Sequence, residues 1–167
     1  MKIAYRAIAV GTVAVALLDA TDGVIYFWLT AQLNPITVLQ YIASGAFGAA
    51  SYSGGLATAF AGLVFHFIIS LAVVSAFVAL YLRSRLVRDL APAAGLAYGA
   101  AVWCIMNVLV LPMTAVTPTT VSALTVVHGL IGHAFFVGLP AALVARRYLP
   151  IKPALGLAIP ARDESAA

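Results

Sequence analysis

Four long apolar stretches alternate with shorter polar segments along this chain. They cover residues 6–29, 57–82, 93–115 and 121–145. A hydrocarbon core about 30 Å thick takes roughly 20 helical residues, so each stretch predicts one membrane-spanning helix. We therefore predict an all-α, polytopic membrane protein with four transmembrane helices. They form a single domain over residues 1–149, followed by a flexible cytoplasmic tail over residues 150–167.

The segment between the first two spans predicts a fifth, shorter helix. Asn34 and Pro35 offer an N-cap and a proline in the first helical position, and residues 36–50 carry no charge. A helix of about 15 residues is too short to cross the membrane. We expect it to lie at the outer interface. The alternative is a re-entrant segment that dips toward the polar residues described below.

Composition and charge agree with a membrane protein. The 167 residues are 64% hydrophobic and 8% charged, and the mean hydropathy is +1.09, which excludes a soluble domain with a polar surface. All nine Lys and Arg residues lie before the first span, between the second and third, or after the fourth. In a four-span chain these segments share one side of the membrane. The positive-inside rule makes that side, with both termini, cytoplasmic.

The basic residues and the aromatic residues also indicate the surroundings of the protein. We expect the net charge of +4 to attract anionic lipid headgroups, and we expect no nucleic-acid partner. Tyr26, at the outer end of the first span, fits the aromatic belt of a membrane protein.

The third and fourth spans contain residues that affect helix packing. Gly95 and Gly99 form a GxxxG motif, which lets helices approach closely either within the bundle or across a dimer. Pro112 and Pro140 each remove a backbone hydrogen bond, so we predict kinks in the outer part of span three and the inner part of span four.

Two aspartates, Asp19 and Asp22, lie in the middle of the first apolar stretch. An acid at the centre of a membrane helix costs roughly 2.5–3.5 kcal/mol on insertion scales. Each strongly apolar residue of the same span contributes only about 0.3–0.6 kcal/mol of favourable insertion free energy. Summed over the span, these contributions only balance the cost of the two acids. A partner, a proton or a cation is needed to neutralise the two acids.

The three histidines and one asparagine lie in the other spans at a similar depth. Counting about 1.5 Å per residue from the cytoplasmic end puts Asp19 at ~20 Å and Asp22 at ~24 Å. The same count gives the following depths: His66 at ~24 Å, Asn107 at ~21 Å, His133 at ~18 Å and His128 at ~25 Å. The sequence therefore predicts a polar layer in the outer half of the bilayer.

Helix periodicity limits how this layer can be arranged. Asp19 and Asp22 are three residues apart and share a helix face. His128 and His133 are five apart, which puts them about 140° apart around an ideal helix, so both reach one point only if the helix is distorted. Gly129 and Gly132 between them permit a bend or a π-bulge. The arrangement we predict has a core that combines Asp22, His66 and one span-four histidine, with Asp19 and Asn107 in a supporting shell.

Several functions suit this layer. Asp19, Asp22, His66, His128 and His133 are ligands for a divalent transition metal such as Zn, Fe, Mn or Ni. The same groups can bind protons and relay them. His66 with His128 or His133 can supply the axial ligands of a haem in a redox subunit. The layer can also be purely structural, in an accessory subunit.

Of these we favour ion binding or transport, by a metal or by protons. Four helices are few for a complete transport pathway, so we expect a homo-oligomer. The chain has no phosphate-binding loop, CxxC or HExxH motif, so nothing indicates a soluble type of enzyme site. An intramembrane metallo-hydrolase stays an alternative, because it requires only a metal with an open position and a carboxylate base.

Several segments resemble a family of small, uncharacterised bacterial inner-membrane proteins with four transmembrane helices. The resemblance rests on the runs NPITVLQYIASGAFG, GLVFHFIIS, MNVLVLP and HAFFVGLPAALVARR and covers most of residues 6–147. It implies a bacterial inner-membrane location and the four-span layout. It implies no activity and no functional residues.

Overall fold

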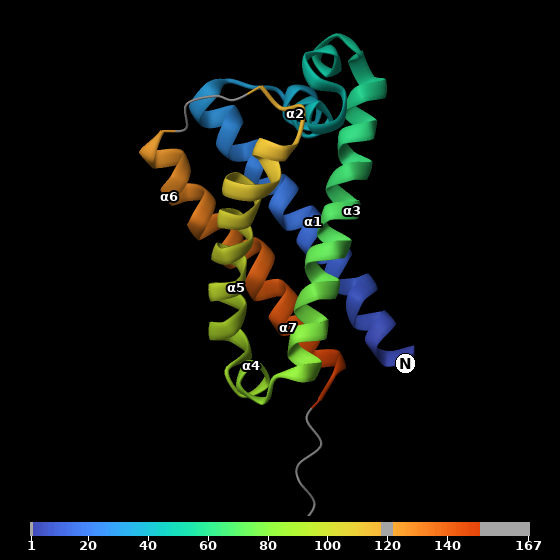
Figure 1. Cartoon of the computed structure of the whole chain (residues 1–167), viewed down its shortest axis with the longest axis vertical. Helices are drawn as coiled ribbons and strands as arrows, with labels where there is room; N and C mark the ends of the chain where they lie inside the picture. Colours follow the sequence, from blue (N-terminus) through green and yellow to red (C-terminus); the bar gives the residue numbers. More distant parts are fainter. Residues whose placement is uncertain (1, 118–121, 151–167) are drawn as a thin grey trace, which may run out of the picture.

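The structure is a computed structural model that describes residues 2–117 and 122–150, and the regular structure in this part of the chain is all helical. Four stretches are long and apolar enough to cross a membrane and pack into a bundle (Figure 1): Ile3–Ala31, Gly55–Arg83, Ala91–Met113 and Ala123–Tyr148. The prediction of an all-α polytopic membrane protein is confirmed. The tail predicted over residues 150–167 lies outside the described residues, apart from Pro150.

The first two spans are uninterrupted α-helices. α1 covers Lys2–Ala31 and α3 covers Gly55–Arg83. A short helix, α4 (Arg85–Asp89), follows α3 and begins at Ser84, whose hydroxyl accepts from a backbone N–H in its first turn. Arg88 donates to two carbonyls in the last turn of α3, which satisfies acceptors that the helix leaves free.

The third and fourth spans each change helix type along their length. Span three consists of α5 (Ala91–Ile105), the π-helix η2 (Met106–Val110) and the 3₁₀ turn η3 (Leu111–Met113); span four consists of α6 (Ala123–Gly132), the π-helix η4 (His133–Gly138) and α7 (Leu139–Tyr148). Each π-helix ends just before Pro112 or Pro140. Proline cannot donate a backbone hydrogen bond to the preceding turn. The predicted distortions of both spans are therefore present as wider helical turns.

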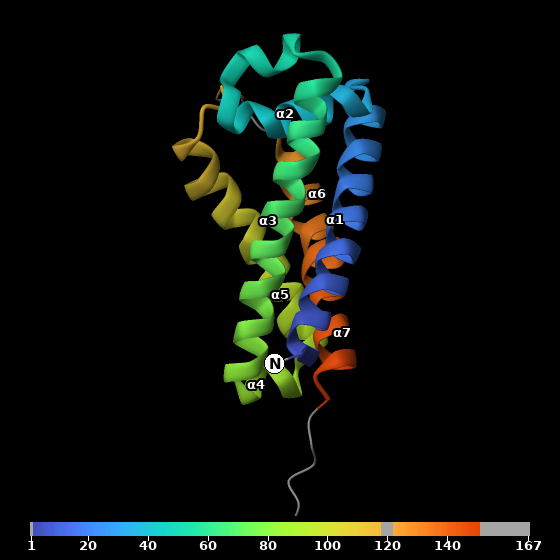
Figure 2. The same cartoon turned by 90° about the vertical axis from the view of Figure 1, so that its right-hand side faces the viewer.

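The basic loop between α3 and α5 lies at one end of the bundle (Figures 1 and 2). The start of α1, α4 and the end of α7 meet there, and we call it the terminal end. The opposite end, where α2 lies, is the α2 end. The arginines of the described residues belong to elements at the terminal end: Arg6, Arg83, Arg85, Arg88, Arg146 and Arg147.

The predicted short helix is present as α2 (Pro35–Phe47), followed by the 3₁₀ helix η1 (Gly48–Ser53). Asn34 is its N-cap, since its side chain accepts from the N–H of Thr37 over 2.9 Å. α2 lies across the bundle and does not run down between the spans (Figure 2). This placement agrees with the interpretation as an interfacial helix.

Two contacts hold α2 against the start of α3. A methyl group at Gly62 would overlap the carbonyl of Leu39, so the two helix backbones touch there. The buried side chain of Gln40 donates to the carbonyl of Gly55 over 3.0 Å. The crossing point at Gly62 is one helical turn from His66, which brings α2 close to the polar layer.

The apolar core lies in the half of the bundle next to the terminal end. It joins α1, α3, α5 and span four through buried side chains: Ala7, Val15, Val74, Phe77, Val78, Tyr81, Ala91, Val137, Ala141, Ala142 and Ala145. The alanines of α7 let that helix approach α1 and α3 closely. The interior of this half is therefore close-packed and mainly apolar.

The GxxxG motif of span three packs inside the bundle. A methyl group at Gly95 would lie 2.7 Å from the carbonyl oxygen of Gly138, and one at Gly99 would overlap the carbonyl of His133. The small residues of α5 thus bring its backbone against η4. The GxxxG motif therefore serves helix packing within the bundle.

The α5–η4 contact predicts a specific sensitivity to added volume. A methyl group at Gly138 would overlap the backbone of Gly95, and backbone atoms cannot rotate away. We expect Gly138→Ala to lower the free energy of unfolding by about 1–3 kcal/mol, the usual cost of overpacking. The measurement is the midpoint of thermal unfolding in detergent. Gly23→Ala is the matched control, since a methyl there meets no atom within 4 Å; equal midpoints for the two variants would contradict the contact.

Candidate functional site

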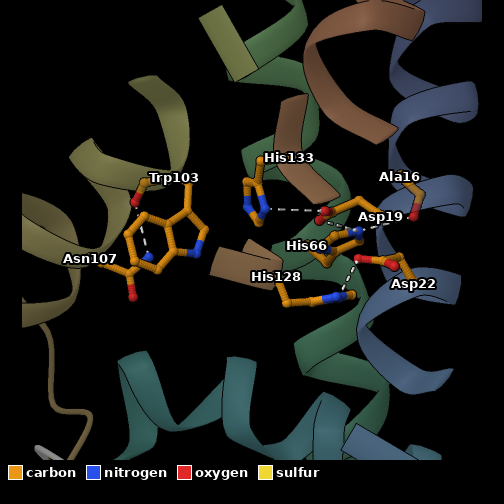
Figure 3. A network of polar contacts seen from close by, with 8 residues as sticks. All are labelled: Ala16, Asp19, Asp22, His66, Trp103, Asn107, His128 and His133. Atoms are coloured by element: carbon orange, nitrogen blue, oxygen red, sulfur yellow. Dashed lines mark hydrogen bonds and ion pairs between the residues drawn. The ribbon is translucent and has the colours of Figure 1, made fainter. Parts of the chain in front are cut away.

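The two acids of α1 face histidines from two other spans (Figure 3). Asp19 and Asp22 share one face of α1, because positions three apart are neighbours on an α-helix. His66 comes from α3, His128 from α6 and His133 from the first position of η4. All five side chains lie in the layer that depth counting predicted.

Asp22 pairs with His128. The Nε2 atom of His128 lies 3.1 Å from Oδ2 of Asp22, within hydrogen-bond distance. The ring of Tyr26 stacks on the imidazole, with centroids 3.9 Å apart and planes 11° apart. The Tyr26 hydroxyl donates to Oγ1 of Thr125 over 2.9 Å. Tyr26 therefore holds both the imidazole and the start of α6 against α1.

Asp19 lies between two other histidines. Its Oδ2 is 4.0 Å from Nε2 of His66, and its Oδ1 is 3.8 Å from Nδ1 of His133. These are ion-pair distances, longer than hydrogen bonds. Nε2 of His66 lies 3.0 Å from the carbonyl oxygen of Ala16. A carbonyl only accepts, so Nε2 of His66 carries the hydrogen and donates it to Ala16.

Antiparallel packing explains why two histidines of one span serve two acids. α1 begins at the terminal end and span four finishes there, so the residue order along the two spans is reversed. His128 therefore meets Asp22, nearer the α2 end, and His133 meets Asp19. The distortion of span four occurs where η4 begins, at His133. The two histidines do not converge on one point, and each has its own carboxylate.

Glycines in α6 make room for the neighbours of this pair. A methyl group at Gly132 would lie 2.7 Å from Oδ2 of Asp22, and one at Gly129 would overlap the indole of Trp103. Sequence analysis interpreted both glycines as bend positions. Their role here is to let a carboxylate and an indole approach the α6 backbone.

Two features of the predicted arrangement are wrong. The acid between His66 and His133 is Asp19, and Asp22 is the partner of His128, so the assignment of Asp22 to the core and Asp19 to a supporting shell is reversed for His66. Asn107 does not join the layer. Its amide donates to the carbonyl of Trp103, one turn away in its own span, over 2.9 Å (Figure 3).

The roles of Tyr26, Trp103 and Gly132 were not predicted from the sequence. Tyr26 carried a usable signal, because it lies four residues after Asp22 and so shares its helix face. An aromatic residue near a span end is also typical of the membrane interface. Tyr26 was therefore assigned to the aromatic belt, and its stacking on His128 was not predicted. The positions of Trp103 and Gly132 depend on how helices approach one another, which leaves no pattern in the sequence.

The histidines of the site differ in side-chain exposure, and the described side chains are not grouped as metal ligands are. The side chain of His66 is 10% exposed and that of His128 is 32% exposed. Within residues 2–117 and 122–150, no three or more His, Cys, Asp or Glu side chains have the grouping of a metal site. The arrangement consists of acid–histidine contacts between helices.

Comparisons with known protein families, with curated proteins and with solved structures find no match. Function must therefore be argued from the site itself.

The Asp22–His128 pair predicts a stability effect that depends on pH. His128→Leu leaves Asp22 without its partner, and we expect this to cost roughly 2.5–3.5 kcal/mol at neutral pH, the cost of an acid in a membrane helix. Protonation neutralises the acid, so the loss should shrink as the pH falls. The measurement is the midpoint of thermal unfolding against pH. The double variant Asp22→Asn/His128→Leu should recover most of the loss; equal midpoints for the single and double variants at neutral pH would refute the pairing.

Proposed function

We propose that this integral membrane protein binds protons at Asp19 and Asp22 and exchanges them with His66, His128 and His133, in proton transport or in ion transport coupled to protons. The observation that supports this most directly is that each carboxylate of α1 lies 4.0 Å or less from an imidazole of another span. Carboxylates and histidines in contact inside a membrane are typical of proton pathways.

Charge balance supports bound protons. Two ionised aspartates beside neutral histidines would leave two uncompensated negative charges among the spans, at roughly 2.5–3.5 kcal/mol each. One additional proton at each acid makes its contact with histidine neutral overall. Histidine is the side chain whose charge changes most readily near neutral pH. We therefore propose that bound protons remove the charges of the two acids.

The hydrogen-bond pattern favours protons over a metal or a haem. The Nε2 atom of His66 donates to Ala16, so it has no lone pair for a metal ion or haem iron. Nε2 of His128 is directed at Asp22. A divalent metal such as Zn, Fe, Mn or Ni, or a haem held by His66 with His128 or His133, would bind through these Nε2 atoms only if they left their present partners.

The orientation belongs to the same proposal. Arginines at the terminal end support a cytoplasmic position for both termini by the positive-inside rule, and contact of these arginines with anionic headgroups. The resemblance described above supports a bacterial inner membrane. In that orientation α2 and the acid–histidine layer lie toward the outer face. Transport through so small a bundle also implies assembly into a homo-oligomer.

Infrared difference spectroscopy between acidic and neutral pH tests proton binding directly. We expect purified protein to show the carbonyl stretch of protonated carboxyl groups, because protons neutralise both acids. Asp19→Asn and Asp22→Asn should each remove part of this signal. Asp89→Asn is the matched control, since Asp89 is an exposed aspartate on α4 outside the site. A signal unchanged by both site variants would overturn the proposal.

Two further measurements on the same preparation separate the alternatives. Stoichiometric metal that is lost in Asp19→Asn would replace protons by a metal, and the absorption band of a haem lost in His66→Ala would replace them by a redox cofactor.

Proton flux into proteoliposomes, followed with a trapped pH-sensitive dye, tests transport. Flux that Asp22→Asn abolishes supports transport, whereas bound protons without flux would remove transport from the proposal. Absence of protons, metal and haem would leave a structural layer.

A further inference from the structure

We infer that the acid–histidine site exchanges protons with the compartment at the α2 end and is sealed from the compartment at the terminal end. This inference rests on the proposed function and adds the side of access. Three observations carry it: a row of hydroxyl groups, a difference in depth and the placement of the apolar core.

A row of hydroxyl groups leads from the site toward the α2 end. The ring of Tyr26 stacks on His128, and its hydroxyl donates to Thr125. Oγ1 of Thr125 lies 2.8 Å from Oγ of Ser122, the exposed N-cap residue of α6. Polar groups in sequence can hold water by hydrogen bonds, which apolar side chains cannot. His128 lies at the start of this row, and its side chain is 32% exposed, against 26% for His133 and 10% for His66.

The site is also nearer to the α2 end along α1. Asp22 is nine residues from Ala31, about 14 Å at 1.5 Å per residue. Asp19 is 17 residues from Lys2, about 26 Å at the same rise. A proton from the α2 end crosses the shorter distance.

The terminal half offers no comparable route. On the buried face of α3, Ser70 follows His66, and the next buried residues are Val74, Phe77, Val78 and Tyr81. The side chains of Val74, Phe77 and Tyr81 are at most 1% exposed. Close-packed interiors contain few spaces as large as a water molecule.

On the terminal side, the hydroxyl groups of Thr12 and Tyr98 do not continue a hydrogen-bonded row from the site. Thr12 is one turn from Ala16 on α1, and its buried hydroxyl has no hydrogen-bond partner among the residues that the structure describes. The Tyr98 hydroxyl is already committed to the carbonyl of Val73, over 2.7 Å. Hydrogen-bonded hydroxyl groups therefore lead toward the α2 end, whereas passage to the other side would require the terminal half to separate.

Cysteine labelling tests the side of access. In a Cys104→Ala background, full-length protein in sealed right-side-out and inside-out vesicles is treated with a membrane-impermeant maleimide. Ser84→Cys, in the loop after α3, identifies the vesicles that expose the terminal end. We expect Thr125→Cys to react only in the opposite vesicles and Ser70→Cys to react in neither. Ser122→Cys replaces Thr125→Cys if that variant does not fold.

The outcomes separate this inference from the proposed function. Reaction of Ser70→Cys from the terminal end, or no reaction of Thr125→Cys and Ser122→Cys from the α2 end, overturns the side of access. The infrared signal of the carboxyl groups does not depend on either result. If that signal is absent while the labelling pattern holds, the proton-binding function falls and this inference falls with it.

Discussion

An ionised carboxylate is stable inside a hydrocarbon layer only when a nearby group compensates its charge, and this constraint organises the half of the bundle next to the α2 end. α1 carries two such groups three residues apart, so two compensating partners must lie at matching heights. Span four supplies them because it runs antiparallel to α1, and α3 adds a third imidazole beside Asp19. The relative position of three spans is thus tied to the neutralisation of two acids.

The two halves of the molecule are built on different principles. Near the terminal end, alanines and valines from four spans pack closely, and helix backbones touch where α5 meets η4. This packing depends on shape and tolerates little added volume. Near the α2 end, the contacts between α1 and α6 are polar or aromatic: Asp22 with His128 and Tyr26 with Thr125. Protonation can change the second kind of contact and leaves the first unaffected, which fits a site that is reached from one end.

The separation of the acids matters for the proposed chemistry. A single centre with all five side chains around one point would resemble a metal site, because a cation gathers its ligands. Here each carboxylate has its own imidazole, and His66 already donates to Ala16. In the proposed function, each acid–histidine contact holds its own proton. The proposed proton-binding function rests on that division.

Local pattern in the sequence determined the spans, the short helix with its Asn34 cap, the distortions before Pro112 and Pro140, and the depth of the acid–histidine layer. Hydropathy, capping and helical rise act over a few residues or along one axis, so the sequence displays them directly. Tertiary structure alone decided that Asp19 lies between His66 and His133, that Asn107 turns to Trp103, and that Gly132 makes room for Asp22. Those outcomes depend on the rotation of each helix about its axis and on how closely two backbones approach. Both are set by packing between distant segments, which no single segment encodes.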